Sequence, residues 1–183
     1  MSNTQTPGIY WGVEDRLANL LGVTALAATD RLRTAVEGEL SHGGSSPAVL
    51  VHLQAYPGES VEAVRRVLGI SQPATVRVVD RLAAEGLVER RPGPDRRSLA
   101  LHLTAVGERA ASAALGRRTR SLRALLDALA PAEQAALVPL LERLVASLAD
   151  DRPQALRVCR LCDRHACTEA PGCPLDHTTQ IAR

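Results

Sequence analysis

The fold of this chain is decided by residues 71–104, which read SQPATVRVVDRLAAEGLVERRPGPDRRSLALHLT. Ser71 is a good helix N-cap, and Pro73 falls in the first turn, where its missing N–H costs nothing. Apolar side chains follow at helical spacing until Gly86, which stands where a left-handed residue would end the helix. The pattern predicts a recognition helix over 71–85 with one packed face and one exposed face.

A strand, a charged turn and a second strand follow this helix. Val88 lies in a short extended apolar segment, and residues 90–97, RRPGPDRR, are too rich in Pro, Gly and charge to be core. Residues 98–103, SLALHL, alternate polar or small with large apolar residues, as a half-buried strand does. A helix followed by a hairpin over 88–103 with a basic tip predicts a winged helix.

Five motifs between Leu68 and Glu108 occur in the order and spacing of MarR-family transcriptional regulators. They are LGISQPAT, VVDRL, AEGLVERR, DRR and LxLTxxGE. The chain resembles this family over residues 1–150, closely across the motifs and by helical patterning alone in the flanking segments. The resemblance implies an effector-responsive homodimer, most often a repressor, that binds a near-palindromic site in double-stranded DNA.

The position of each residue on the winged helix and the resemblance together indicate which side chains contact DNA. The predicted DNA-binding residues are Ser71, Gln72, Pro73, Thr75, Val76, Arg77, Arg81, Arg96 and Arg97, with Asp80 and Asp95 as supports of the wing. Arg77 suits bidentate pairing with guanine and Gln72 with adenine, and either pair discriminates between bases by ~1–3 kcal/mol. Arg96 and Arg97 at the wing tip suit a narrow minor groove, where the negative potential is strongest.

DNA binding has alternatives in other classes of function. A charged hairpin alone is more often solvated surface, and a winged helix can also be a protein–protein adaptor that never binds DNA. The sequence contains no nucleophile elbow, zinc-protease helix motif or phosphate-binding Gly-rich loop, which argues against an enzyme. His52 and His102 both fall on elements predicted to be packed, so we interpret them as structural residues.

Composition favours helices and an intracellular location. The chain has 183 residues, 45% of them hydrophobic but only 2% aromatic with no Phe, so Leu, Val and Ala must build the core. All 22 basic residues are Arg and the net charge is only +2, so local charge must account for any DNA binding. We find neither a signal peptide nor a membrane-spanning apolar run, and we therefore expect a cytoplasmic protein.

Long helices with apolar stripes flank the winged helix. The predicted divisions are a flexible arm over 1–12, a dimerisation helix over 13–45, the winged helix-turn-helix over 46–104, dimerisation helices over 105–150 and a cysteine-rich tail over 151–183. A long helix in so small a chain needs a second surface to cover it, and a two-fold partner is the simplest source, although packing within its own chain remains an alternative. Ser46 is the expected N-cap of the helix that begins at Pro47, and Pro139 is expected to kink the last helix.

The four cysteines all lie within the tail, as Cys159, Cys162, Cys167 and Cys173 in the spacing C-x2-C-x4-C-x5-C. Four thiolates suit one metal centre, either Zn²⁺ or an iron–sulfur cluster, and the spacing leaves both open. His165 and His177 are possible substitute ligands. A thiol switch without metal is the alternative, and the alternative function is a metal- or redox-sensing regulator whose four-cysteine tail is the sensor. We expect the metal to fold an otherwise coreless tail and to affect DNA binding only from a distance.

Overall fold

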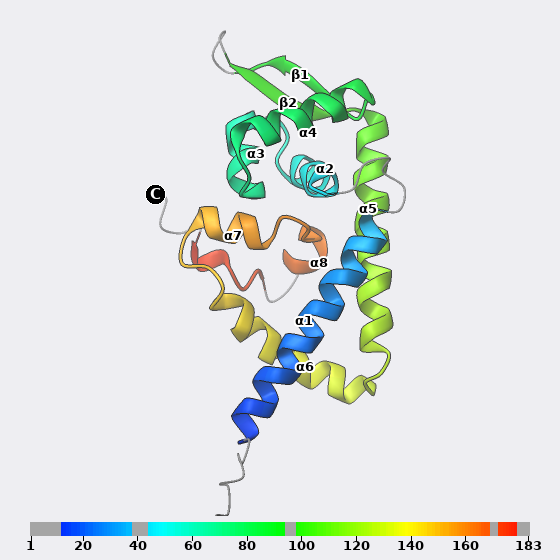
Figure 1. Ribbon diagram of the computed structural model, residues 1–183, viewed down its shortest axis with the longest axis vertical. Helices are drawn as coiled ribbons and strands as arrows, with labels where there is room; N and C mark the ends of the chain where they lie inside the picture. Colours follow the sequence, from blue (N-terminus) through cyan, green and yellow to red (C-terminus); the bar gives the residue numbers. More distant parts are fainter. Residues whose placement is uncertain (1–11, 38–43, 94–97, 169–171, 179–183) are drawn as a thin grey trace, which may run out of the picture.

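Helices and one small sheet make up the protein, whose computed structural model describes residues 12–37, 44–93, 98–168 and 172–178 (Figure 1). The elements are α1 Val13–Glu37, α2 Ser46–Ala55, α3 Val61–Leu68, α4 Gln72–Ala84, β1 Val88–Pro92, β2 Leu99–Leu103, α5 Ala105–Leu126, α6 Pro131–Ala146, α7 Arg152–Val158, α8 Arg164–Thr168 and a 3-10 helix, Asp176–Thr178. The predicted fold class, mainly helical with a small β-wing, is confirmed.

The helix-turn-helix consists of α3 and α4. The Ser60 side chain caps α3 by accepting a hydrogen bond from the Ala63 N–H, and Gly69 ends the helix in the left-handed region at φ +65°. Glycine adopts this conformation without the steric cost that a Cβ would add. Ser71 has the extended backbone of an N-cap, although its side chain makes no capping hydrogen bond. The turn between the two helices is therefore held mainly by Gly69.

The predicted start of α2 is wrong by one residue. Ser45 occupies the N-cap position and Ser46 already belongs to the helix, with Pro47 in its first turn. The helix is buried continuously over residues 46–53, and the Ser46 hydroxyl has no hydrogen-bond partner among the described residues. The Ser45 carbonyl accepts the first helical hydrogen bond, from the Val49 N–H at 3.1 Å, which places Ser46 inside the helix.

The wing is an antiparallel hairpin with Val88 opposite Leu103 and Pro92 opposite Leu99. An isolated bridge joins Leu101 to Glu59, and the Leu101 N–H donates to the Glu59 carbonyl at 2.9 Å. The hairpin is thereby attached to the turn between α2 and α3.

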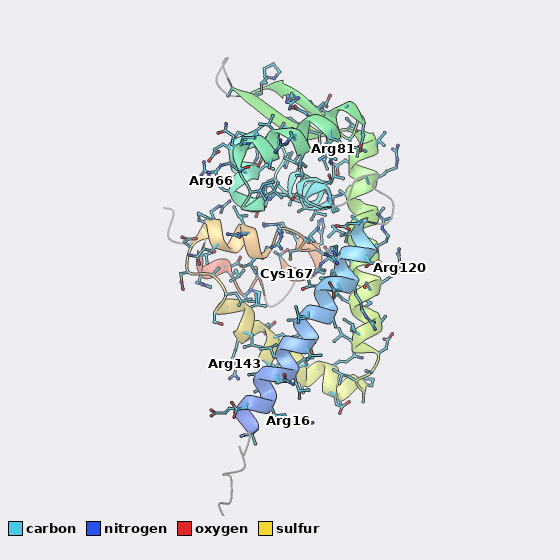
Figure 2. All side chains as sticks on the ribbon, in the orientation of Figure 1. Arg16, Arg66, Arg81, Arg120, Arg143 and Cys167 are labelled. Carbon is cyan, nitrogen blue, oxygen red and sulfur yellow. The ribbon has the colours of Figure 1, made fainter. Side chains whose placement is uncertain are left out.

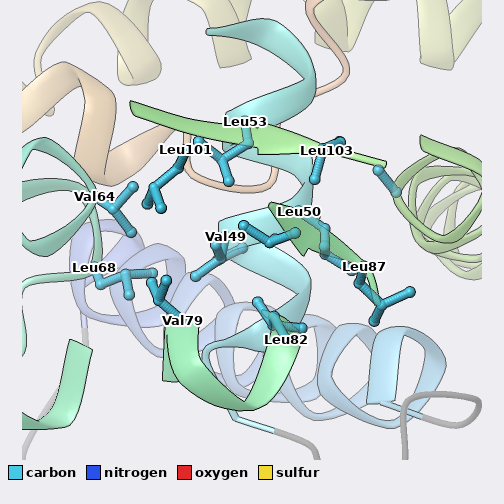
Figure 3. Close-up of a cluster of buried hydrophobic side chains, with 13 residues drawn as sticks. Val49, Leu50, Leu53, Val64, Leu68, Val79, Leu82, Leu87, Leu101 and Leu103 are labelled. Atoms are coloured by element: carbon cyan, nitrogen blue, oxygen red, sulfur yellow. The ribbon is translucent and has the colours of Figure 1, made fainter. Parts of the chain in front are cut away.

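The core of the winged helix is built almost entirely from Leu and Val (Figure 3). Its fully buried side chains come from α2, α3, α4 and β2, and the largest are Leu50, Leu53, Leu82, Leu101, Val49, Val64 and Val79. Burying each such side chain contributes ~1.5–3 kcal/mol. The low aromatic content is thus compatible with a closely packed centre.

The start of α5 is tied to the end of α4 by the threonine of the LxLTxxGE motif. The Thr104 hydroxyl donates to the Gly86 carbonyl at 2.6 Å and accepts from the Gly107 N–H at 3.1 Å. A Cβ at Gly107 would lie 2.0 Å from the Leu87 carbonyl oxygen, so only glycine fits there. This close approach explains a glycine for which the sequence alone offers no reason.

Helices α1, α5 and α6 extend away from the winged helix (Figure 1). α1 packs on α5, yet its only buried residue is Val36, and α6 has none. Apolar side chains remain exposed on both helices, among them Leu17, Leu20, Leu21 and Leu26 on α1, and Leu140, Leu141, Leu144 and Leu148 on and after α6. α6 runs through Pro139 without interruption.

The tail is not coreless, and this expectation is corrected. Ala149, Ala155 and Leu175 are buried together and contact Val145 near the end of α6. α7 also packs on α3, and Leu161 contacts the core of the winged helix. Apolar residues scattered singly through the tail supply these contacts, which is why periodicity did not reveal them.

Two glycines of α5 provide a matched test of the junction. Gly107→Ala should destabilise the protein by about 1–3 kcal/mol or more, because the new methyl group meets the backbone of Leu87. Gly116→Ala, whose Cβ would have only the flexible end of Arg120 nearby at 3.5 Å, should stabilise it by about 0.5–1 kcal/mol through helix propensity. Urea denaturation measures the free energy of unfolding of both variants. Equal effects of the two substitutions would contradict the close packing of Gly107 against Leu87.

Candidate DNA-binding surface and thiol cluster

The outer face of α4 is formed by most of the residues predicted to contact DNA. Ser71, Gln72, Pro73, Val76, Arg77 and Arg81 are all exposed. Thr75 is an exception that corrects the prediction: its exposed fraction is 0%, and its hydroxyl donates to the Ser71 carbonyl at 3.1 Å. Thr75 lies on the packed face of α4 with Val79 and Leu82, so its side chain does not reach the helix surface.

Charges on the winged helix are divided between paired and unpaired arginines. Arg90 on β1 donates to the Asp80 carboxylate of α4 at 2.5 Å, and Arg91 pairs with Glu89 beside it. Among the described residues, Arg77 and Arg81 have neither an ion-pair nor a hydrogen-bond partner for their guanidinium groups. The contact of Asp80 with a wing strand agrees with its predicted supporting role, and the unpaired cations remain available to a ligand.

The wing tip falls outside the described residues. Asp95, Arg96 and Arg97 belong to this segment, so their predicted roles remain predictions. The strands on either side of it, β1 and β2, are described and paired.

His52 is a structural residue, as predicted, and it belongs to a small polar cluster that sequence analysis missed. Its exposed fraction is 4%, its Nε2 lies 2.5 Å from Glu59 Oε2, and its ring lies 5.0 Å from that of Tyr56. The Arg164 guanidinium lies 4.8 Å from the centre of the Tyr56 ring and also donates to its hydroxyl. No sequence signal links Arg164 to Tyr56, because they come from segments far apart in the chain.

The four cysteines line one cavity of about 140 Å³ between α7, α8 and the segment before the 3-10 helix. All are free thiols of intermediate burial. They lie near enough to interact in a chain, Cys173 with Cys167, Cys167 with Cys162, and Cys162 with Cys159. Figure 2 shows Cys167 in the middle of the molecule, between the winged helix and α6.

The thiols differ in acidity. A hydrogen bond from Cys162 lowers the pKa of Cys159, whereas the same bond, together with burial, raises the pKa of Cys162. Burial is the main cause of the raised pKa values of Cys167 and Cys173. Cys159 is therefore the thiol of this cluster whose ionisation is favoured.

The two histidines named as substitute ligands are arranged differently. His177 faces the carbonyl oxygens of Pro174 and Ala149, each 3.1 Å from one of its ring nitrogens, so it ties the tail to the end of α6. His165 is exposed. Within the described part of the chain, no three Cys, His, Asp or Glu side chains are already arranged as ligands of one ion.

A larger groove of about 820 Å³ lies between α2, α5 and the tail. Arg120, Arg123 and Arg164 line it, with Asp163 as the single carboxylate among its lining residues. Gln54 and Ser112, which are hydrogen-bonded to each other at 2.9 Å, also line it. The groove has the charge and polarity to bind an organic anion.

The fold and the exposed, partly cationic face of α4 define a winged helix-turn-helix protein. The sequence model of the MarR family matches residues 44–98. None of the curated proteins compared with the chain matches it in sequence.

Solved structures share the fold over most of the chain. MarR from E. coli in its apo form is 24% identical with a TM-score of 0.59, and the match covers 70% of this chain and 96% of that one. RV1404 from Mycobacterium tuberculosis is 23% identical with a TM-score of 0.63, covering 78% and 96%. RV2887 from the same organism, in complex with p-aminosalicylic acid, is 25% identical with a TM-score of 0.56, covering 70% and 97%.

Residues 44–98 thus match the MarR family in sequence, and the structure shares the fold of MarR-family proteins over about three quarters of the chain. Among the described residues no single helix has the length and apolarity to cross a membrane; α5 and α6 together pass that test but are bent by 116° relative to each other.

Proposed function

We propose that this protein is a DNA-binding transcriptional regulator, a homodimeric repressor that places α4 in the major groove of a near-palindromic DNA site. The observation that carries this proposal is the unpaired Arg77 on the exposed face of α4, one turn after Pro73. Side chains near the N-terminus of a recognition helix reach base edges, whereas contacts to phosphate hold the helix in register. Gln72, Val76 and Arg77 are the proposed base-contacting residues, and the wing follows the neighbouring minor groove.

The exposed apolar side chains of α1 and α6 support a dimer. Leu17 is 66% exposed and Leu144 is 48% exposed, and several similar residues accompany each. Soluble monomers rarely leave so many large apolar groups in contact with water, and a two-fold partner would cover them. The dimer would present two copies of α4 about one DNA turn, ~34 Å, apart. A dimer bound to its operator would block access of the transcription machinery to the DNA. The protein would therefore act as a repressor in the cytoplasm.

The groove between α2 and α5 supports an effector site. Arg120 and Arg123 have no carboxylate partner among the described residues, so an anionic ligand would meet unneutralised cations. The groove contacts both the central helix of the DNA-binding core and the long α5. An effector bound there would bias the position of one relative to the other, which is the requirement for coupling two sites.

Substitutions of Arg77 and of Arg97 should impair DNA binding in different ways. Arg77→Ala should cost ~1–3 kcal/mol and relax the preference at one base pair, because a bidentate contact is lost. Arg97→Ala should weaken binding to most sequences and reduce its salt dependence. Binding titrations against operator variants at several salt concentrations measure both.

The control for this experiment is Arg16→Ala, because Arg16 is exposed on α1 at the opposite end of the molecule from Arg81 (Figure 2). It should bind DNA like the unchanged protein. Unaltered affinity in the Arg77 and Arg97 variants would refute the assigned surface.

The dimer proposal is tested on α6. Replacing Leu141 and Leu144 together by Asp should raise the dimer dissociation constant at least about a hundredfold, because each leucine that the dimer would bury contributes ~1.5–3 kcal/mol. Arg143→Asp introduces the same side chain between them on another face and should leave the dimer intact. Light scattering at micromolar concentration gives the mass, and a monomeric unchanged protein would contradict the proposal.

The effector site is tested with p-aminosalicylate, the ligand present in the RV2887 complex. Calorimetry should detect binding that Arg123→Ala weakens about tenfold, since a charge-assisted hydrogen bond is lost. Arg109→Ala removes an exposed arginine of α5 that does not line the groove and should have no effect. Equal affinities in the two variants would place the ligand elsewhere.

A further inference from the structure

Three short segments of the tail bring all four cysteines of the chain to one cavity. Cys159 follows α7, Cys162 lies two residues before α8, Cys167 lies within α8, and Cys173 precedes the 3-10 helix. The Cys162 N–H donates to the Cys159 carbonyl at 2.8 Å, so the first pair lies on a tight turn. Thiols on a tight turn can converge on one centre, as C-x2-C pairs do in zinc sites.

We propose that Cys159, Cys162, Cys167 and Cys173 bind one Zn²⁺ ion, and that the loaded segment clamps the winged helix through Arg157 and Arg164. The zinc site is independent of the proposed function, whereas its effect on DNA binding rests on that function. Binding converts four thiols and one Zn²⁺ into a tetrathiolate complex of charge −2 and releases four protons. The charges of Arg164, which acts on Cys159, and of Arg118, which acts on Cys162, would offset part of this charge.

The contacts between the thiols favour a single ion over an iron–sulfur cluster. Four sulfurs at ~2.3 Å from one tetrahedral zinc lie only ~3.8 Å from each other. The sulfurs of this cluster interact in adjacent pairs and line one cavity. Zinc binding includes a movement of these side chains, because no three of the four described cysteines are yet arranged around one point. In a four-iron cluster each thiolate binds a different iron, so the sulfurs must stand further apart.

The first clamp joins the tail to the wing through a series of side chains, each of which contacts the next in space. Arg164, between Cys162 and Cys167, stacks on Tyr56 and donates to its hydroxyl. Tyr56 packs on the buried His52, whose ring contacts Glu59. The backbone of Glu59 is in turn bridged to β2. Fixing the cysteines on both sides of Arg164 would therefore hold the turn to which the wing is attached.

The second clamp acts on the turn of the helix-turn-helix. The guanidinium of Arg157, two residues before Cys159, lies so close to Gly69 that a Cβ there would be 2.7 Å from Arg157 Cζ. Gly69 ends α3 and is separated from α4 only by Ile70 and Ser71. α7 also packs along α3. A metal ion that orders the end of α7 would thus fix the orientation of the recognition helix α4. Loss of the metal would allow α4 to change its orientation.

The metal is tested first, without DNA. The full-length protein purified without chelators should contain about one zinc per chain by elemental analysis. Cys162→Ser should lose it, whereas His165→Ala, a neighbouring exposed residue, should retain it. Protein without metal, an iron–sulfur cluster with visible absorption, or loss of zinc in the His165 variant would each overturn the four-thiolate zinc site.

The clamp is tested by hydrogen exchange of the zinc-loaded and zinc-free protein. Removing zinc should speed exchange in α3 and in the first turn of α4 by about tenfold, the size of a typical coupling between sites. Tyr56→Leu should keep its zinc yet speed exchange around Glu59 and β2, whereas Tyr56→Phe, which keeps the ring, should not. Unchanged exchange on zinc removal would refute the clamp.

DNA binding separates the two proposals. Zinc removal should weaken operator binding about tenfold while the winged helix stays folded by circular dichroism. If zinc-loaded protein binds no DNA, the proposed function fails and the zinc site stands on its metal content. If affinity is the same with and without zinc, the clamp fails and the proposed function stands.

Discussion

Burial of one face of α4 is the constraint on which the rest of the structure depends. Val79 and Leu82 are fully buried against the Leu and Val side chains of α2 and the wing strands. A helix with 3.6 residues per turn that buries this face must direct the opposite one outward. The exposed Gln72, Val76 and Arg77 are thus placed by packing, and Thr75 is withdrawn from the surface for the same reason.

Electrostatics then decides which cations on this surface remain free. The net charge of the chain is only +2, so a general attraction to DNA is weak. Asp80 and Glu89 neutralise two arginines of β1 and stiffen the wing, whereas Arg77 and Arg81 lack such partners among the described residues. An exposed ion pair contributes little to stability, so its main effect here is to position the wing relative to α4.

The cysteine-rich tail is part of the same body as the winged helix. Leu161 reaches the main core, Arg157 contacts Gly69, and Arg164 contacts Tyr56. The segment that carries the thiols is therefore joined to the turn between α3 and α4 through Arg157. These contacts replace the expectation of a remote tail with that of a segment packed on the winged helix.

Sequence alone determined the order and type of the elements from α1 to α6, because helix caps, apolar periodicity and turn residues are local properties of the chain, whereas it did not predict the short helices of the tail. Ser71, Pro73 and Gly86 were enough to delimit α4, and the alternation after Ser98 was enough to predict β2. The cysteine spacing likewise indicated a common centre. Only the tertiary structure decided that Thr75 is buried, that Gly107 must be glycine, and that Arg164 meets Tyr56. Each of these depends on which segments pack together, and such contacts between distant parts of the chain leave no periodic signal in the sequence.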